Sequence, residues 1–201
     1  MTMEATMTAP TQPAPSPQRR RQVVPSAVLG TLIFIFTEVM FFSGLISAFT
    51  ISKAGALPGT WPMPGQPRLP AEATMLNTAL LILSAIVLLV GWRLSKKSSP
   101  IAHWVVLAAW GLGAGFVALQ GVEWAALLAN GMTLTSSPLG SFFYVIVGGH
   151  ALHAVGALIA LFFAWVQMAR GKLTGGLFFG AQTFWYFVVA MWPIIYARVY
   201  F

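Results

Sequence analysis

The segment Ala27-Val-Leu-Gly-Thr-Leu-Ile-Phe-Ile-Phe-Thr-Glu-Val-Met-Phe-Phe-Ser-Gly-Leu-Ile-Ser-Ala-Phe-Thr-Ile51 is almost entirely apolar and holds one ionisable residue, Glu38. A helix needs about 20 mostly apolar residues to cross the hydrocarbon core of a bilayer. The segment is therefore predicted to be a transmembrane helix. An ionisable side chain at that depth is costly and usually faces protein or a cavity. Glu38 is thus expected to point into a helix bundle.

Four further apolar segments of similar length follow along the chain. They are Ala73–Trp92, Trp104–Ala129, Leu139–Met168 and Gly176–Ala197. The predicted fold class is all-α, an integral membrane bundle of five transmembrane helices formed by residues 23–201. Residues 1–22 are rich in Pro, Thr and Ala and lack an apolar core, so they are predicted to be a disordered tail without a cleavable signal.

The overall composition supports the membrane class. Hydrophobic residues make up 58% of the chain and charged residues 7%, whereas a soluble domain carries about 25% charged residues. The net charge of +7 does not indicate nucleic-acid binding, because the basic residues lie between the apolar segments. The chain has no Cys, which excludes disulfides, thiolate metal sites and cysteine nucleophiles.

The basic residues also predict the orientation in the membrane. They cluster before the first segment, after the second and after the fourth, as Arg19–Arg21, Arg93–Lys97 and Arg170–Lys172. The opposite loops carry only Lys53 and Arg68. Cytoplasmic loops are enriched in Lys and Arg, so the N-terminus is predicted to be cytoplasmic and the C-terminus outside.

Matched depths predict two polar pairs. At a rise of about 1.5 Å per residue, Glu38 lies level with His150 and His153, and Glu123 lies level with Asn77. Gln120 is one turn deeper than Glu123. Further candidate buried polar residues are Gln182 and Tyr186, on one face of the last segment. We interpret these groups as hydrogen-bonded pairs that fix the bundle.

Small residues spaced by four predict close helix contacts. The third segment has Gly111 and Gly115, and the fourth has Gly156, Ala160 and Ala164. These positions are interpreted as ordinary membrane packing faces.

The polar residues allow two functional alternatives. His150 and His153 with a carboxylate could ligate iron, and Glu38 could be a proton or ion relay. Against a metal or haem site, the chain holds only three His. No catalytic residue and no metal ligand set is therefore predicted, and no Ser/His/Asp arrangement, phosphate loop or nucleotide signature occurs.

Several motifs, in order, resemble cytochrome c oxidase subunit III, the third large subunit of haem-copper oxidases. Thr37–Gly44 resembles the family's S/T-E-V-x-F-F segment, and Leu76-Asn-Thr78 its L-N-T helix start. The other matching stretches are Leu119–Trp124 (L-Q-x-x-E-Y), Gly140–Phe143 (G-S-x-F-F), Gly148–His153 (G-x-H-G-x-H) and Trp185–Trp192 (W-H-F-V-D-x-x-W). The matches extend over residues 30–201.

The resemblance implies a non-catalytic subunit of a bacterial terminal oxidase in the plasma (inner) membrane. In that family, subunit I holds haem and copper and reduces oxygen to water with proton pumping, and subunit II carries the electron-entry domain. Subunit III packs against subunit I and supports its proton uptake and sustained turnover. The expected partners are therefore subunits I and II and membrane lipids, with no nucleic acid. No cofactor is expected in this chain.

The chain also departs from the family pattern. Larger members have seven helices, of which this chain matches the last five. The two missing helices form one arm of a lipid-holding cleft, so the resemblance does not carry that cleft over, and a bound phospholipid stays a candidate ligand. Tyr186 stands where the family has His, and Val189 where it has Asp.

Two other functions stay open at this point. One is a five-helix accessory protein of nitric oxide reductase, which has the same fold and a different partner. The other is a self-standing transporter or channel. Transporters tend to show internal repeats, broken helices and more buried charge, and none of these is clear in the sequence.

Overall fold

Five long helices make up the part of the chain that the structure describes. The computed structural model describes residues 26–201, with α1 (Ser26–Ala54), α2 (Ala71–Lys96), α3 (Ala102–Ala129), α4 (Pro138–Ala169) and α5 (Gly175–Val199). No strand occurs in residues 26–201. All five helices are long and apolar enough to cross a membrane. The predicted all-α class with five membrane helices is confirmed, and the helix bounds agree with the prediction to within a few residues.

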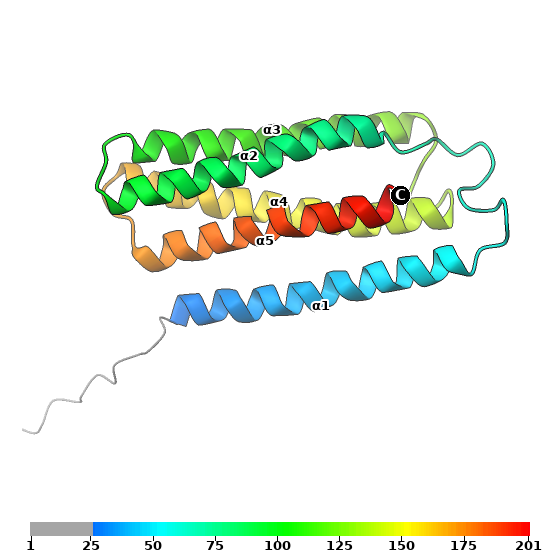
Figure 1. Ribbon diagram of the computed structural model, residues 1–201, viewed down its shortest axis with the longest axis horizontal. Coiled ribbons are helices and arrows are strands. Elements are labelled where there is room, and N and C mark those ends of the chain that lie inside the picture. The colour runs from blue at the N-terminus through cyan, green and yellow to red at the C-terminus, as the bar shows by residue number, and fades with distance from the viewer. Residues whose placement is uncertain (1–25) are drawn as a thin grey trace, which may run out of the picture.

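The helices run up and down through one bundle (Figure 1). The start of α1, the α2–α3 connection and the α4–α5 connection lie at one end, and the other two connections lie at the opposite end. The predicted tail 1–22, with Arg19–Arg21, lies outside the described residues. The tail's disorder and the side of the membrane that each end faces stay predictions.

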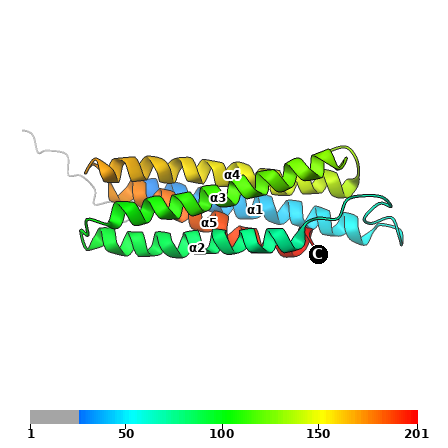
Figure 2. The same cartoon turned by 90° about the horizontal axis from the view of Figure 1, so that it is seen from above.

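The fifth helix is the centre of the bundle. It packs against α1, α2 and α4, whereas α2 pairs with α3 on one side (Figures 1 and 2). Of its most apolar stretch, 56% is buried, against 11% for α1. The first helix lies at the edge, in contact with α5 and α4, and so most of its surface is exposed.

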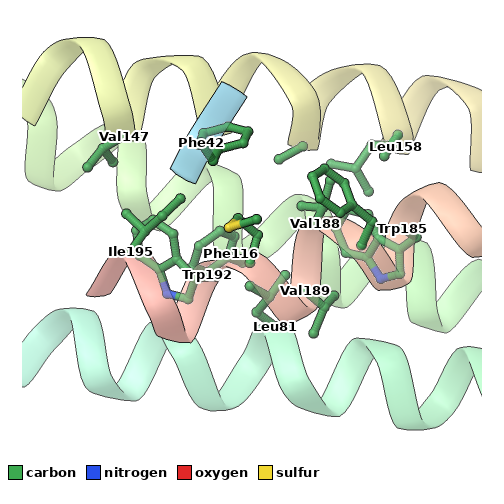
Figure 3. Close-up of a cluster of buried hydrophobic side chains, with 14 of the residues drawn as sticks. Phe42, Leu81, Phe116, Val147, Leu158, Trp185, Val188, Val189, Trp192 and Ile195 are labelled. Carbon is green, nitrogen blue, oxygen red and sulfur yellow. The ribbon is translucent and has the colours of Figure 1, made fainter. Parts of the chain in front are cut away.

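Large aromatic side chains of α5 fill the space between α2 and α4 (Figure 3). Trp185 and Trp192 are fully buried. Each indole N–H donates to a hydroxyl of α2, Trp185 Nε1 to Ser84 Oγ at 2.9 Å and Trp192 Nε1 to Thr78 Oγ1 at 2.8 Å. Because apolar surface gains little from helix association in lipid, such hydrogen bonds and close packing hold the helices together.

The small-residue positions of α3 differ from the prediction. A Cβ built at Gly111 or Gly115 would meet no atom within 4 Å. One at Gly113 would lie 2.5 and 2.6 Å from ring carbons of Trp185. Residues two positions apart in sequence differ by about 200° around the helix axis. Gly113 therefore faces the bundle, and Gly111 and Gly115 face away from it. The predicted contact at Gly111 and Gly115 is thus corrected, within this chain, to Gly113.

The small residues of α4 lie nearer to the core. A Cβ at Gly156 would be 3.8 Å from the Phe184 ring. Ala164 is fully buried, and Ala160 is partly buried against the apolar core. This face of α4 therefore supports a close approach of α5.

Candidate functional site

The carboxylate of Glu123 on α3 accepts hydrogen bonds from three side chains. Thr74 Oγ1 donates to Oε2 at 2.7 Å, Asn77 Nδ2 donates to Oε1 at 2.7 Å, and Gln120 Nε2 donates to Oε2 at 2.9 Å. Thr74 and Asn77 both belong to α2 and are buried. The structure therefore brings Asn77, Gln120 and Glu123 together, and the cluster joins α2 to α3.

The end of the chain extends this cluster. Gln120 Nε2 also donates to the phenol oxygen of Tyr200 at 3.3 Å. Burial raises the pKa of Tyr200, so its phenol stays neutral near neutral pH. Neither Thr74 nor Tyr200 was predicted from the sequence. Thr74 lies one turn before Asn77, on the same helix face, which is a signal that could have found it; Tyr200 follows α5 and carries no such pattern.

A second polar pair lies between α1 and α4. Glu38 Oε2 is 2.9 Å from His153 Nε2, and each side chain is only 16% exposed. His153 Nδ1 lies 2.6 Å from the backbone oxygen of Gly149. A carbonyl only accepts, so Nδ1 carries a proton. The contact with Glu38 then holds one more proton, placed either on Nε2, giving an ion pair, or on the carboxyl, giving a neutral hydrogen bond.

His150 is placed differently. It is 2% exposed, and its ring stacks on Trp192 with centroids 5.1 Å apart at 29°. Of the two histidines that the matched depths offered to Glu38, the structure pairs only His153 with it. No group of three or more His, Asp or Glu within the described residues could hold a metal ion.

Gln182 and Tyr186 on α5 belong to neither cluster. Gln182 is 8% exposed. Gln182 Oε1 and the Tyr186 hydroxyl are buried, with no hydrogen-bond partner in the described part of the chain. The structure thus places both side chains inside the bundle without connecting them to Glu38 or Glu123.

These helices and polar pairs can be compared with known proteins. The family model described as cytochrome c oxidase subunit III matches residues 16–201. The chain belongs to the cytochrome c oxidase subunit III family. It is therefore a multi-pass membrane protein and a subunit of a multi-subunit oxidase complex.

The chain is also similar to individual members of the subunit III family over most of its length. The chain is 33% identical over 178 residues to a probable cytochrome c oxidase subunit 3 of Nocardia farcinica, with 86% of each chain covered. It is 30% identical over 182 residues to that of Mycobacterium tuberculosis, again with 86% of each covered. The cytochrome c oxidase subunit 3 of Latimeria chalumnae is 32% identical over 185 residues, which cover 85% of this chain and 67% of that protein.

Proposed function

We propose that this chain is a non-catalytic subunit III of a bacterial haem-copper terminal oxidase. It packs against subunit I, stabilises it and supports its proton uptake during oxygen reduction. Haem and copper are held by subunit I, subunit II completes the complex, and phospholipid is a candidate ligand of this chain. The bacterial plasma membrane is the proposed location, which the Nocardia and Mycobacterium relatives support.

This proposal rests on the contacts that the acidic side chains make within the bundle. Glu123 accepts three hydrogen bonds between helices, and Glu38 pairs with His153. Both carboxylates are therefore engaged in joining helices rather than gathered as ligands. Carboxylates that join helices in this way agree with a subunit that supports a catalytic neighbour.

The outer surface supports association with a membrane partner. Large apolar side chains are exposed along α1, among them Ile33, Phe36 and Met40. Because α1 lies at the edge of the bundle, its exposed side is free for lipid or for subunit I. This makes α1 the helix whose position depends most on the Glu38–His153 contact.

Co-purification tests the proposed partner. An affinity tag is placed on this chain in its native host, and the membranes are dissolved in a mild detergent. We expect the tag to retain subunit I, recognised by stoichiometric haem and copper, together with subunit II. Retention of this chain alone, or of a complex without haem-copper spectra, would refute the assignment of the partner.

A further inference from the structure

A pocket of about 160 Å³ lies between α3 and α4 and is closed on one side by Trp192 of α5. Most of its wall is apolar, with Phe116, Val117 and Val147 among the lining residues. Gly121 of α3 also lines the pocket and is exposed. The pocket therefore opens to the surface of the bundle beside this residue. Gln120 and His150 also line the pocket, whereas Glu38, Glu123 and His153 do not.

Three of the lining residues carry buried polar atoms that lack a hydrogen-bond partner among residues 26–201. These atoms are Gln120 Oε1, Trp124 Nε1 and His150 Nε2. Gln120 and His150 are 5% and 2% exposed. A buried polar group without a partner is costly, and native structures hold few of them. Three around one pocket indicate a guest that supplies the missing hydrogen bonds.

The chemistry of these atoms restricts the guest. Gln120 Nε2 faces the Glu123 carboxylate and donates to it, so the free atom of Gln120 is its carbonyl oxygen, which only accepts. The Trp124 indole N–H only donates. One group that satisfies both must accept and donate at once. A hydroxyl does so, whereas a ketone or an ester only accepts and an alkyl chain does neither.

We propose that this pocket binds a neutral, lipid-soluble molecule through its hydroxyl group. The apolar wall suits an apolar body, and an apolar cavity of about 150 Å³ is known to hold a benzene ring. The three polar atoms belong to side chains that line the pocket but are themselves buried. The terminal torsions of Gln, Trp and His side chains are broad, so we expect side-chain rotation to expose these atoms when a guest enters. The natural guest is a neutral lipid with a free hydroxyl.

Water could make the same hydrogen bonds but would gain nothing from the apolar wall. The test therefore distinguishes a lipid-soluble alcohol from water as the occupant of the pocket. The complete oxidase in native membranes is photolabelled with a diazirine-bearing octanol and, in parallel, with the matching diazirine-bearing octane. We expect the octanol to label peptides 116–124 and 147–154 about tenfold more than the octane, since only the octanol makes the hydrogen bonds. Equal labelling by the two probes, or labelling of neither peptide as in a pocket that holds water only, would overturn the proposal.

Two glycines of α3 give a matched pair of variants. A Cβ at Gly121 or at Gly115 meets no atom within 4 Å, but only Gly121 lines the pocket. We expect Gly121→Leu to lower octanol labelling about tenfold, to the level of the octane probe, and Gly115→Leu to leave it unchanged. Unchanged labelling in Gly121→Leu, or an equal loss in Gly115→Leu, would contradict the site. Should Gly121→Leu fail to assemble, the two probes on the unaltered complex still decide.

Discussion

Glu38 of α1 and His153 of α4 lie 2.9 Å apart, Oε2 to Nε2. The contact joins the edge helix to the rest of the bundle. Because His153 Nδ1 is held by the Gly149 carbonyl at 2.6 Å, only Nε2 is free to meet Glu38. The pair shares one proton and is neutral overall in both of its forms, which suits a low-dielectric setting.

Replacing Glu38 tests this pairing. In Glu38→Gln an amide still hydrogen-bonds to His153, so we expect the thermal midpoint of the purified complex to change little. In Glu38→Leu the histidine loses its partner, and we expect a loss of about 1–3 kcal/mol with easier release of α1. Equal stability of the two variants would contradict the structural role of the pair.

Glu123 is expected to be the more sensitive carboxylate. Glu123→Leu removes three hydrogen bonds at once. Thr74 keeps the Pro70 carbonyl at 2.9 Å and Gln120 keeps the Tyr200 oxygen, whereas Asn77 is left as an unpaired buried donor, which costs about 1–3 kcal/mol. We therefore expect a larger drop in thermal midpoint than for Glu38→Leu. The matched control is Glu72→Leu, because Glu72 is an exposed residue in the first turn of α2. A control that destabilises as much as Glu123→Leu would show that loss of charge, not the cluster, is responsible.

Variants at two glycines of α3 distinguish a tightly packed position from an open one. A Cβ at Gly113 would overlap the Trp185 ring, so we expect Gly113→Ala to destabilise by about 1–3 kcal/mol through overpacking. Gly111→Ala, two residues earlier on the exposed side, is expected to be neutral or slightly stabilising because Ala favours helix. Thermal denaturation of both complexes measures the difference. The opposite order would mean that Gly111 is the tighter contact in the assembled oxidase.

The orientation can be measured on single cysteines, since the chain has none of its own. Met63→Cys lies in the α1–α2 connection and Lys172→Cys in the α4–α5 connection, and both positions are exposed. In intact cells a membrane-impermeant maleimide should label Cys at position 63 and spare position 172. The reverse pattern would invert the topology that the Arg and Lys residues predict.

Sequence alone predicted the helices because each is a long apolar segment whose length matches the bilayer. It also placed Asn77 level with Glu123, because depth along a helix follows from residue count. The direction in which each residue faces around its helix axis was harder to predict. All five helices are apolar on every side, so no amphipathic pattern told Gly113 from Gly111 or directed His150 toward Trp192 rather than Glu38.

Contacts across distant segments were beyond prediction for a related reason. Tyr200 meets Gln120 only because α5 ends beside α3, and the hydroxyls of Ser84 and Thr78 become acceptors only where Trp185 and Trp192 cross α2. Such hydroxyls are common in membrane helices and carry no sequence signal of their own.

Oxygen consumption over many turnovers tests the supporting role most directly. The oxidase is purified with this chain and after its depletion, and both preparations are followed at equal haem content from the first turnover to inactivation. We predict nearly equal initial rates and a faster loss of activity in the depleted enzyme, with Glu38→Leu lying between the two. An initial rate abolished by depletion or by Glu38→Leu, in an otherwise assembled complex, would contradict the account and make this chain part of the catalytic proton path.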